Sequence, residues 1–82
     1  MQLTCYPNPT TDLINIEYAI KENSETSLQI MSIDGKIVYE YDFGFQTNGS
    51  YNHQIDISSF ASGTYFVSLN SLGSRLIKKI VK

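Results

Sequence analysis

His53 and Cys5 are the residue types in this 82-residue chain most often used for catalysis or metal binding, and each occurs once. A zinc site or a nucleophile with its base needs further ligating or reactive groups nearby, and no second imidazole or thiol exists. His53 lies at an inward position of an alternating segment, which favours a hydrogen-bonded structural histidine over a catalytic base. A single cysteine forms no intrachain disulfide and no thiolate cluster, so Cys5 is expected to be a small, half-buried apolar residue.

The carboxylates and serines show no spacing typical of an active site. Asp12, Asp34 and Asp56 lie at or beside predicted turns, where aspartate side chains bond to their own backbone. No D-x-D-x-D-G calcium loop, G-x-S-x-G serine elbow or glycine-rich phosphate loop is present. We therefore predict a protein without enzymatic activity, cofactor or metal.

Composition and charge indicate one globular domain over residues 1–82, with 41% apolar and 17% charged residues. The net charge of −2 argues against generic nucleic-acid binding. From Ser71 onward the chain carries basic residues and no acid, so these bases either keep a last strand soluble or contact a partner. The sequence shows no signal-peptide pattern and no apolar run of membrane-spanning length. Met1 is interpreted as an initiator residue ahead of a fragment of a longer protein.

Period-two alternation dominates the chain, and turn signals recur every eight to twelve residues. Together with abundant tyrosine, isoleucine and threonine, this predicts strands and no helix. The predicted architecture is an all-β, antiparallel, Ig-like β-sandwich of about seven short strands, at residues 3–6, 13–19, 26–33, 36–43, 51–57, 63–70 and 74–81.

Three connections carry recognisable turn chemistry. Asp34-Gly35 is the strongest hairpin signal and predicts a two-residue primed turn, with a bulge expected near Met31 and Ile33. Residues 44–50 read as a loop containing the turn pair Asn48-Gly49, and residues 71–73 as a further hairpin turn. Residues 58–62 are too short for a helix and predict a tight crossing anchored by Phe60.

Aromatic residues raise an alternative, a ring platform for sugars like those of sandwich-type carbohydrate modules. The rings at 39, 41 and 43 share one strand face with Ile37, which favours core packing instead. Phe45, Phe66 and Tyr18 remain as candidate surface rings.

Three blocks, in order and with their spacing, resemble a known family. They are YPNP followed by the strand LINIEY, then LQIMSIDGKIVYE, and finally IDISSFASGTYFVSL leading to RLIKKIVK. This pattern is similar to the type A C-terminal sorting domain of cargo proteins of the type IX secretion system of Bacteroidetes.

The resemblance implies a secretion signal that directs an attached N-terminal cargo across the outer membrane. The implied partners are the outer-membrane translocon, its shuttle protein and a sortase that removes the domain. The implied localisation is the periplasm in transit, then the cell surface or the medium. The alternative is an Ig-like accessory module that binds carbohydrate or protein for an attached enzyme.

The resemblance also implies a set of recognition or motif residues. A physical role accompanies several of them: the prolines end strand pairing, Gly35 supplies positive φ, and the last strand combines apolar area with lysines. The motif residues are Pro7, Asn8, Pro9, Asp34, Gly35, Lys36, Gly63, Tyr65, Lys78, Lys79, Ile80, Val81 and Lys82.

Overall fold

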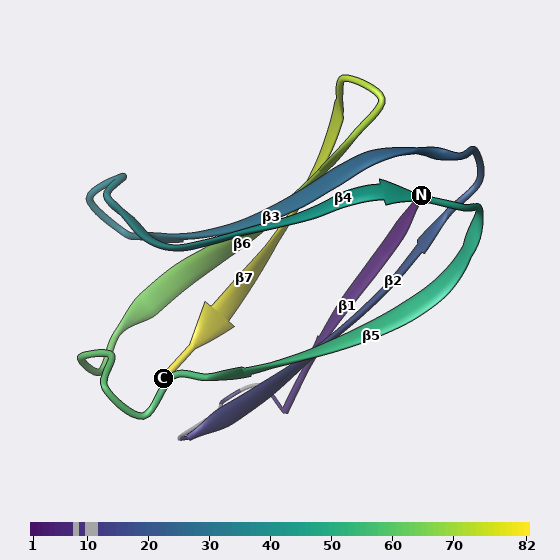
Figure 1. The fold of residues 1–82 in the computed structure, drawn as a ribbon. Coiled ribbons are helices and arrows are strands. Elements are labelled where there is room, and N and C mark those ends of the chain that lie inside the picture. Colours follow the sequence, from purple (N-terminus) through teal and green to yellow (C-terminus); the bar gives the residue numbers. More distant parts are fainter. Residues whose placement is uncertain (8, 10–11) are drawn as a thin grey trace.

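The computed structural model describes residues 1–7, 9 and 12–82 and shows two antiparallel sheets packed face to face (Figure 1). One sheet, sheet A, has the strand order β1-β2-β5, and the other, sheet B, has the order β4-β3-β6-β7. The predicted all-β antiparallel sandwich of seven strands is confirmed. The strands are β1 (Gln2–Tyr6), β2 (Leu13–Ile20), β3 (Ser24–Ser32), β4 (Ile37–Gln46), β5 (Gly49–Asp56), β6 (Thr64–Ser71) and β7 (Ser74–Val81).

Alternating side chains build the core between the two sheets. In β6, Tyr65, Val67 and Leu69 point inward and are buried, as their period-two spacing predicts. The middle strands of both sheets supply most of the core, because both of their neighbours shield them from water. The buried apolar residues are Leu3, Ile14, Ile16, Tyr18, Ile20, Leu28, Ile30, Ile55, Ile57, Tyr65, Val67, Leu69 and Ile80.

The hairpin between β3 and β4 differs from the predicted two-residue primed turn. It is a four-residue connection, in which the Gly35 N–H donates to the Ser32 carbonyl at 2.9 Å and the Ser32 N–H donates to the Lys36 carbonyl at 2.8 Å. Gly35 has a φ of 87°, whereas Asp34 is not among the residues with positive φ. A primed type I turn needs positive φ at both central residues, so only the glycine follows the prediction.

The two-residue turn with positive φ at both positions lies instead between β6 and β7. Leu72 and Gly73 have φ values of 53° and 75°, and Ser71 pairs directly with Ser74. Leucine rarely adopts positive φ. The sequence therefore predicted the position of this hairpin correctly but not its turn type.

β4 is longer and less regular than predicted. It continues through Gln46, so residues 44–46 are strand and not loop, with an irregularity where Gly44 pairs with Thr26. A bulge is present beside Met31, but its extra residue is Val38 of β4, not a residue of the strand 26–33 as expected, and Ile33 lies beyond the end of β3.

Because of this bulge, the prediction that Ile37 shares the inner face with Tyr39 is wrong. The bulge places Ile37 opposite outward-facing Met31, so Ile37 leaves the inner face and is 48% exposed. Tyr39 and Phe43 do pack against the core, while Tyr41 stays 44% exposed at the edge of the sheet.

The prediction that Tyr18 is a surface ring is wrong. Tyr18 is 3% exposed and lies between the sheets, against Phe43 and Tyr51 with ring centroids 5.3 Å away in both cases. Its hydroxyl donates to the Gln46 side chain at 2.8 Å, which satisfies the buried polar end of the ring. Phe45 is exposed and Phe66 is half-buried on the outer face of sheet B.

Candidate functional site

The two residues with the most reactive side chains are both held in unreactive states. Burial raises the pKa of the Cys5 thiol to about 11, and the charge of Lys78 opposes only part of this shift. The thiol is therefore protonated near neutral pH, which disfavours nucleophilic attack. His53 is hydrogen-bonded through Nε2 to the Tyr39 hydroxyl at 3.1 Å, and burial lowers its pKa below 6.5.

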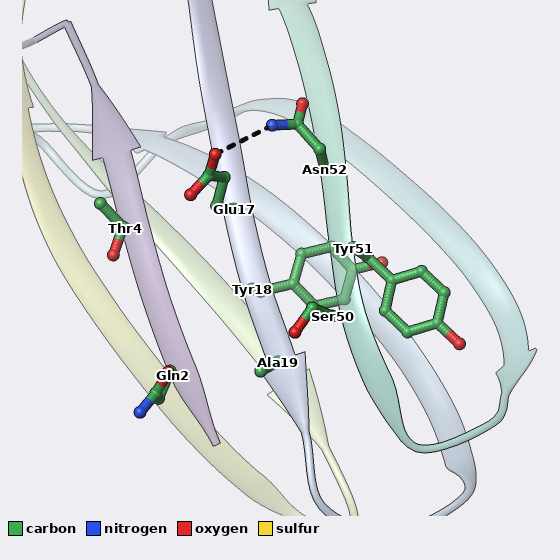
Figure 2. A pocket seen from close by; sticks show the side chains of 8 residues that line it. All are labelled: Gln2, Thr4, Glu17, Tyr18, Ala19, Ser50, Tyr51 and Asn52. Carbon is green, nitrogen blue, oxygen red and sulfur yellow. Dashed lines mark hydrogen bonds between the residues drawn. The ribbon is translucent and has the colours of Figure 1, made fainter.

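One open surface depression lies on the outer face of sheet A and has a volume of about 380 Å³. Figure 2 shows that Glu17 and Asn52 meet above it, joined by a hydrogen bond of 3.4 Å. Glu17 also accepts a hydrogen bond from the Tyr6 hydroxyl at 2.7 Å, which raises the pKa of Tyr6. These groups satisfy one another on an open polar sheet face. The lining side chains are Gln2, Thr4, Glu17, Tyr18, Ala19, Ser50, Tyr51 and Asn52.

Among the described residues, no three histidine, cysteine or acidic side chains are grouped so that they could hold a metal ion. The described residues also include no helix that is long and apolar enough to span a membrane.

The motif residues form four groups along the chain, at 7–9, 34–36, 63–65 and 78–82, which we call the four motif blocks. Topology brings these blocks to one end of the sandwich. Within each sheet every paired neighbour is antiparallel, and the short 21–23 connection reverses the chain between β2 and β3. Strands β1, β3, β5 and β7 therefore run toward this end, and β2, β4 and β6 run away from it (Figure 1). The connections after β1, β3 and β5 therefore lie together with the end of β7, on the left in Figure 1. We call this the motif end; it comprises Pro7, Pro9, Asp12, the loops 33–36 and 57–63, and Lys82.

The remaining connections lie at the opposite end of the sandwich. This opposite end comprises Met1 and the loops 21–23, 47–48 and 72–73. Figure 1 places the first residue of the chain there, away from the last.

Gly63 and Lys82 pair through their backbones at the motif end. The Gly63 N–H donates to the Lys82 carbonyl at 3.0 Å, and the Lys82 N–H donates to the Gly63 carbonyl at 2.8 Å. This pair extends the β6–β7 ladder by one step beyond Thr64 and Val81, which joins two motif blocks directly.

Side chains then attach the 57–63 loop to the same corner. The Lys82 ammonium donates to the Ser58 carbonyl at 3.0 Å and also to the Phe60 carbonyl. The Tyr65 hydroxyl donates to the Ala61 carbonyl at 2.6 Å, and the rings of Tyr65 and Phe60 lie 5.4 Å apart. Lys82 and Tyr65 therefore shape the loop, and the predicted anchoring role of Phe60 fits its packing on Tyr65.

The first motif block joins this corner through Asp12, whose carbonyl accepts the Ile57 N–H at 2.7 Å. Pro7 and Pro9 are exposed beside it, and the Tyr6–Pro7 peptide bond is cis. Asn8 lies outside the described residues.

The 33–36 loop is ordered by its own polar groups. The Ser32 hydroxyl donates to the Asp34 carboxylate, and this bond is the main cause that lowers the pKa of Asp34. Ile33 is 74% exposed beside Lys36, so this loop presents both an apolar and a charged side chain to solvent.

The basic block of β7 is divided between two faces. Ile80 is fully buried, whereas Lys79 and Val81 lie on the outer face of sheet B. Lys78 follows the inward phase of Leu76 and Ile80, and reaches the gap between β7 and β1 beside Cys5. The lysines are therefore not one surface feature.

Sequence reasoning missed Asp12, Ser58, Phe60 and Ala61 as backbone partners of motif residues. A carbonyl acceptor has no residue-type signal, because every residue carries one. The one sequence feature that points to these contacts is Tyr65, an inward tyrosine that closely follows the short 57–63 loop.

In this all-β sandwich the motif residues converge on the loops at one end and do not line a catalytic pocket. Such an arrangement is typical of a binding module. A family model described as a secretion system C-terminal sorting domain matches residues 4–82. The chain therefore belongs to the family of type IX secretion C-terminal sorting domains. No curated protein matches the chain significantly.

Proposed function

We propose that this chain directs an attached cargo across the outer membrane through the type IX system, and that the motif end is its recognition surface. Membership of the sorting-domain family supports a role as a secretion signal. The observation that carries the assignment to the motif end is the convergence of all four motif blocks there.

The position of the two chain ends is compatible with this role. Family membership implies a cargo on the N-terminal side, and Met1 lies at the opposite end from Lys82 (Figure 1). A cargo joined there leaves the motif end open to the translocon and its shuttle protein. Passage through the periplasm, removal by a sortase and arrival at the surface or in the medium complete the proposed route.

No chemistry by the domain itself is part of this proposal. Recognition needs exposed groups on a rigid frame, and the motif end offers Ile33, Lys36, Pro7 and Pro9 on loops tied to the sandwich by backbone hydrogen bonds. Buried motif residues such as Ile80 and Tyr65 contribute by holding those loops in place.

The test is export of a periplasm-targeted fluorescent reporter fused ahead of residues 3–82 in a Bacteroidetes host. Ile33→Asp with Lys36→Glu changes the motif end. Lys21→Glu with Leu72→Asp makes the same types of change at the opposite end, where aspartate tolerates positive φ. We expect the first double variant to lose most export and the second to retain it, with both folded by circular dichroism.

A host without the translocon provides the baseline. Retention of the unmodified fusion in the periplasm would overturn the secretion role itself. Export of both double variants at the unmodified level would overturn only the assignment to the motif end.

A further inference from the structure

The outer face of sheet B is unusually apolar for a face turned toward solvent. Ile77 is 50% exposed on the edge strand β7, and Phe66, Met31 and Val38, one on each of the other three strands, are also not fully buried. The outer face of sheet A carries amides, hydroxyls and Glu17 at the equivalent positions. The outer face of sheet B therefore carries more of the exposed large apolar side chains than the outer face of sheet A does.

Ser68 lies in the middle of this outer face, between its cross-strand neighbours Gln29 and Ile77. Its hydroxyl is buried and has no hydrogen-bond partner among the described residues. Neighbouring side chains of the same sheet therefore cover this hydroxyl, and the centre of the face is an apolar, water-poor environment.

Charge on this face is divided by strand. On the β4 side, Glu40 and Asp42 are acidic, and on the β7 side Arg75 is basic. The cross-strand register places these charges in rows. One row runs Asp42, Ser27, Asn70, Arg75, and the next runs Glu40, Gln29, Ser68, Ile77.

From this arrangement we propose that the outer face of sheet B binds a second copy of the chain, face to face. The two-fold axis runs parallel to the strands, between β3 and β6. This operation exchanges β4 with β7, so Asp42 faces Arg75 of the second copy, and Arg75 faces its Asp42. It also places Met31 opposite Phe66 of the second copy, since these residues share a row.

The contact area sets the expected strength. Four strands spaced by about 4.8 Å, each about 26 Å long, cover about 500 Å² per copy. That is about a tenth of the 4827 Å² surface of the chain, and lies at the lower limit of specific interfaces. The dimer is therefore weak and forms reversibly as concentration rises. This proposal does not depend on the secretion role.

Sedimentation of the 82-residue chain from about 10 μM to about 1 mM should show a monomer–dimer equilibrium. Asp42→Lys alone and Arg75→Glu alone each place like charges opposite one another twice, and should raise the Kd about tenfold or more. An equimolar mixture of the two variants restores both attractive pairs, and should dimerise about as well as the unmodified chain. Glu22→Lys, the same charge change in the 21–23 loop, should leave the Kd unchanged.

A chain that stays monomeric throughout would overturn the proposal, as would variants that dimerise normally or a mixture that fails to recover. Asp42 also accepts the Gly44 N–H at 2.8 Å, so its variant is checked by thermal unfolding. Dilution of the unmodified chain gives an independent measurement by NMR. Amide chemical shifts should change with concentration for outward-facing residues of sheet B and not for those of sheet A. The reverse pattern would contradict the assignment of the interface to sheet B.

Discussion

At the scale of single residues, burial and hydrogen bonding give His53 a structural role. Its imidazole contacts the rings of Tyr41 and Phe43, with centroids 4.8 and 5.0 Å away, and its Nε2 is hydrogen-bonded to Tyr39. Desolvation disfavours the imidazolium and so lowers the pKa of His53.

This lowered pKa predicts a dependence of stability on pH. The unfolded chain binds the histidine proton more tightly than the folded protein does, so unfolding takes up a proton as the pH falls below about 6.5. The free energy of unfolding should therefore fall between pH 6.5 and the lowered pKa, by at most about 1.4 kcal/mol per pH unit. Urea unfolding across about pH 5 to 8 measures this free energy. The range stops at about pH 5 because carboxylates begin to titrate below that value. A His53→Gln variant that keeps the same slope would show that another group is responsible.

Lys82 is the second residue whose role the structure defines, because its ammonium holds two carbonyls of the 57–63 loop. Lys82→Met keeps the aliphatic stem and removes the donor, so we expect the free energy of unfolding to fall by about 1–2 kcal/mol. Urea denaturation provides the measurement, with Lys21→Met at the exposed opposite end as the matched control. Equal stability of the two variants would show that the Lys82 ammonium contributes no net free energy.

At the scale of elements, β7 carries isoleucine at two very different positions, one in the core and one on the outer face of sheet B. Ile80 is fully buried opposite Tyr65, whereas Ile77 is half exposed on the outer face. Truncating the strand would therefore remove core packing together with any recognition group, and single substitutions are needed to separate them.

For β7 we expect Ile80→Ala to lower the free energy of unfolding by about 2–5 kcal/mol, because it leaves a cavity between the sheets. Ile77→Ala should cost about 1 kcal/mol or less, since little apolar contact is lost at an exposed strand position. Thermal or urea unfolding at low concentration compares the two while avoiding association. Similar losses for both would mean that Ile77 is packed in solution more tightly than its exposure indicates.

The connections show how far the sequence predicts elements. All seven strands and the hairpins at 33–36 and 72–73 follow from alternation and turn residues, whereas the connection predicted at 44–50 is shorter, at 47–48, with Gly49 already in β5. The convergence of the motif blocks follows once the antiparallel order is known. Turn type was less accessible: Asp34-Gly35 adopts a four-residue connection, and Leu72-Gly73 the tight one. The bulges in β4 changed the register, which moved Ile37 to the outer face.

At the scale of the whole molecule, stability should be concentrated in the middle strands. β2, β3 and β6 are bonded on both sides, whereas β1, β5, β4 and β7 each have one free edge within their sheet. Amide hydrogen exchange should therefore be slowest around Val67 and Leu69 of β6, and faster by about tenfold or more in β1. Faster exchange in β6 than in β1 would contradict the described strand order.

The sequence by itself determined the strands, the inward faces of β2 and β6 and the family, because alternation, turn chemistry and ordered motifs are local properties of the chain. Only the tertiary structure decided which residues meet. Strand order brought Asp12 to Ile57 and Lys82 to Ser58, and cross-strand register set Asp42 and Arg75 at opposite sides of one row. Such pairings arise from hydrogen bonding between segments distant in sequence, and backbone acceptors and sheet edges carry no residue-type signal that would reveal them in advance.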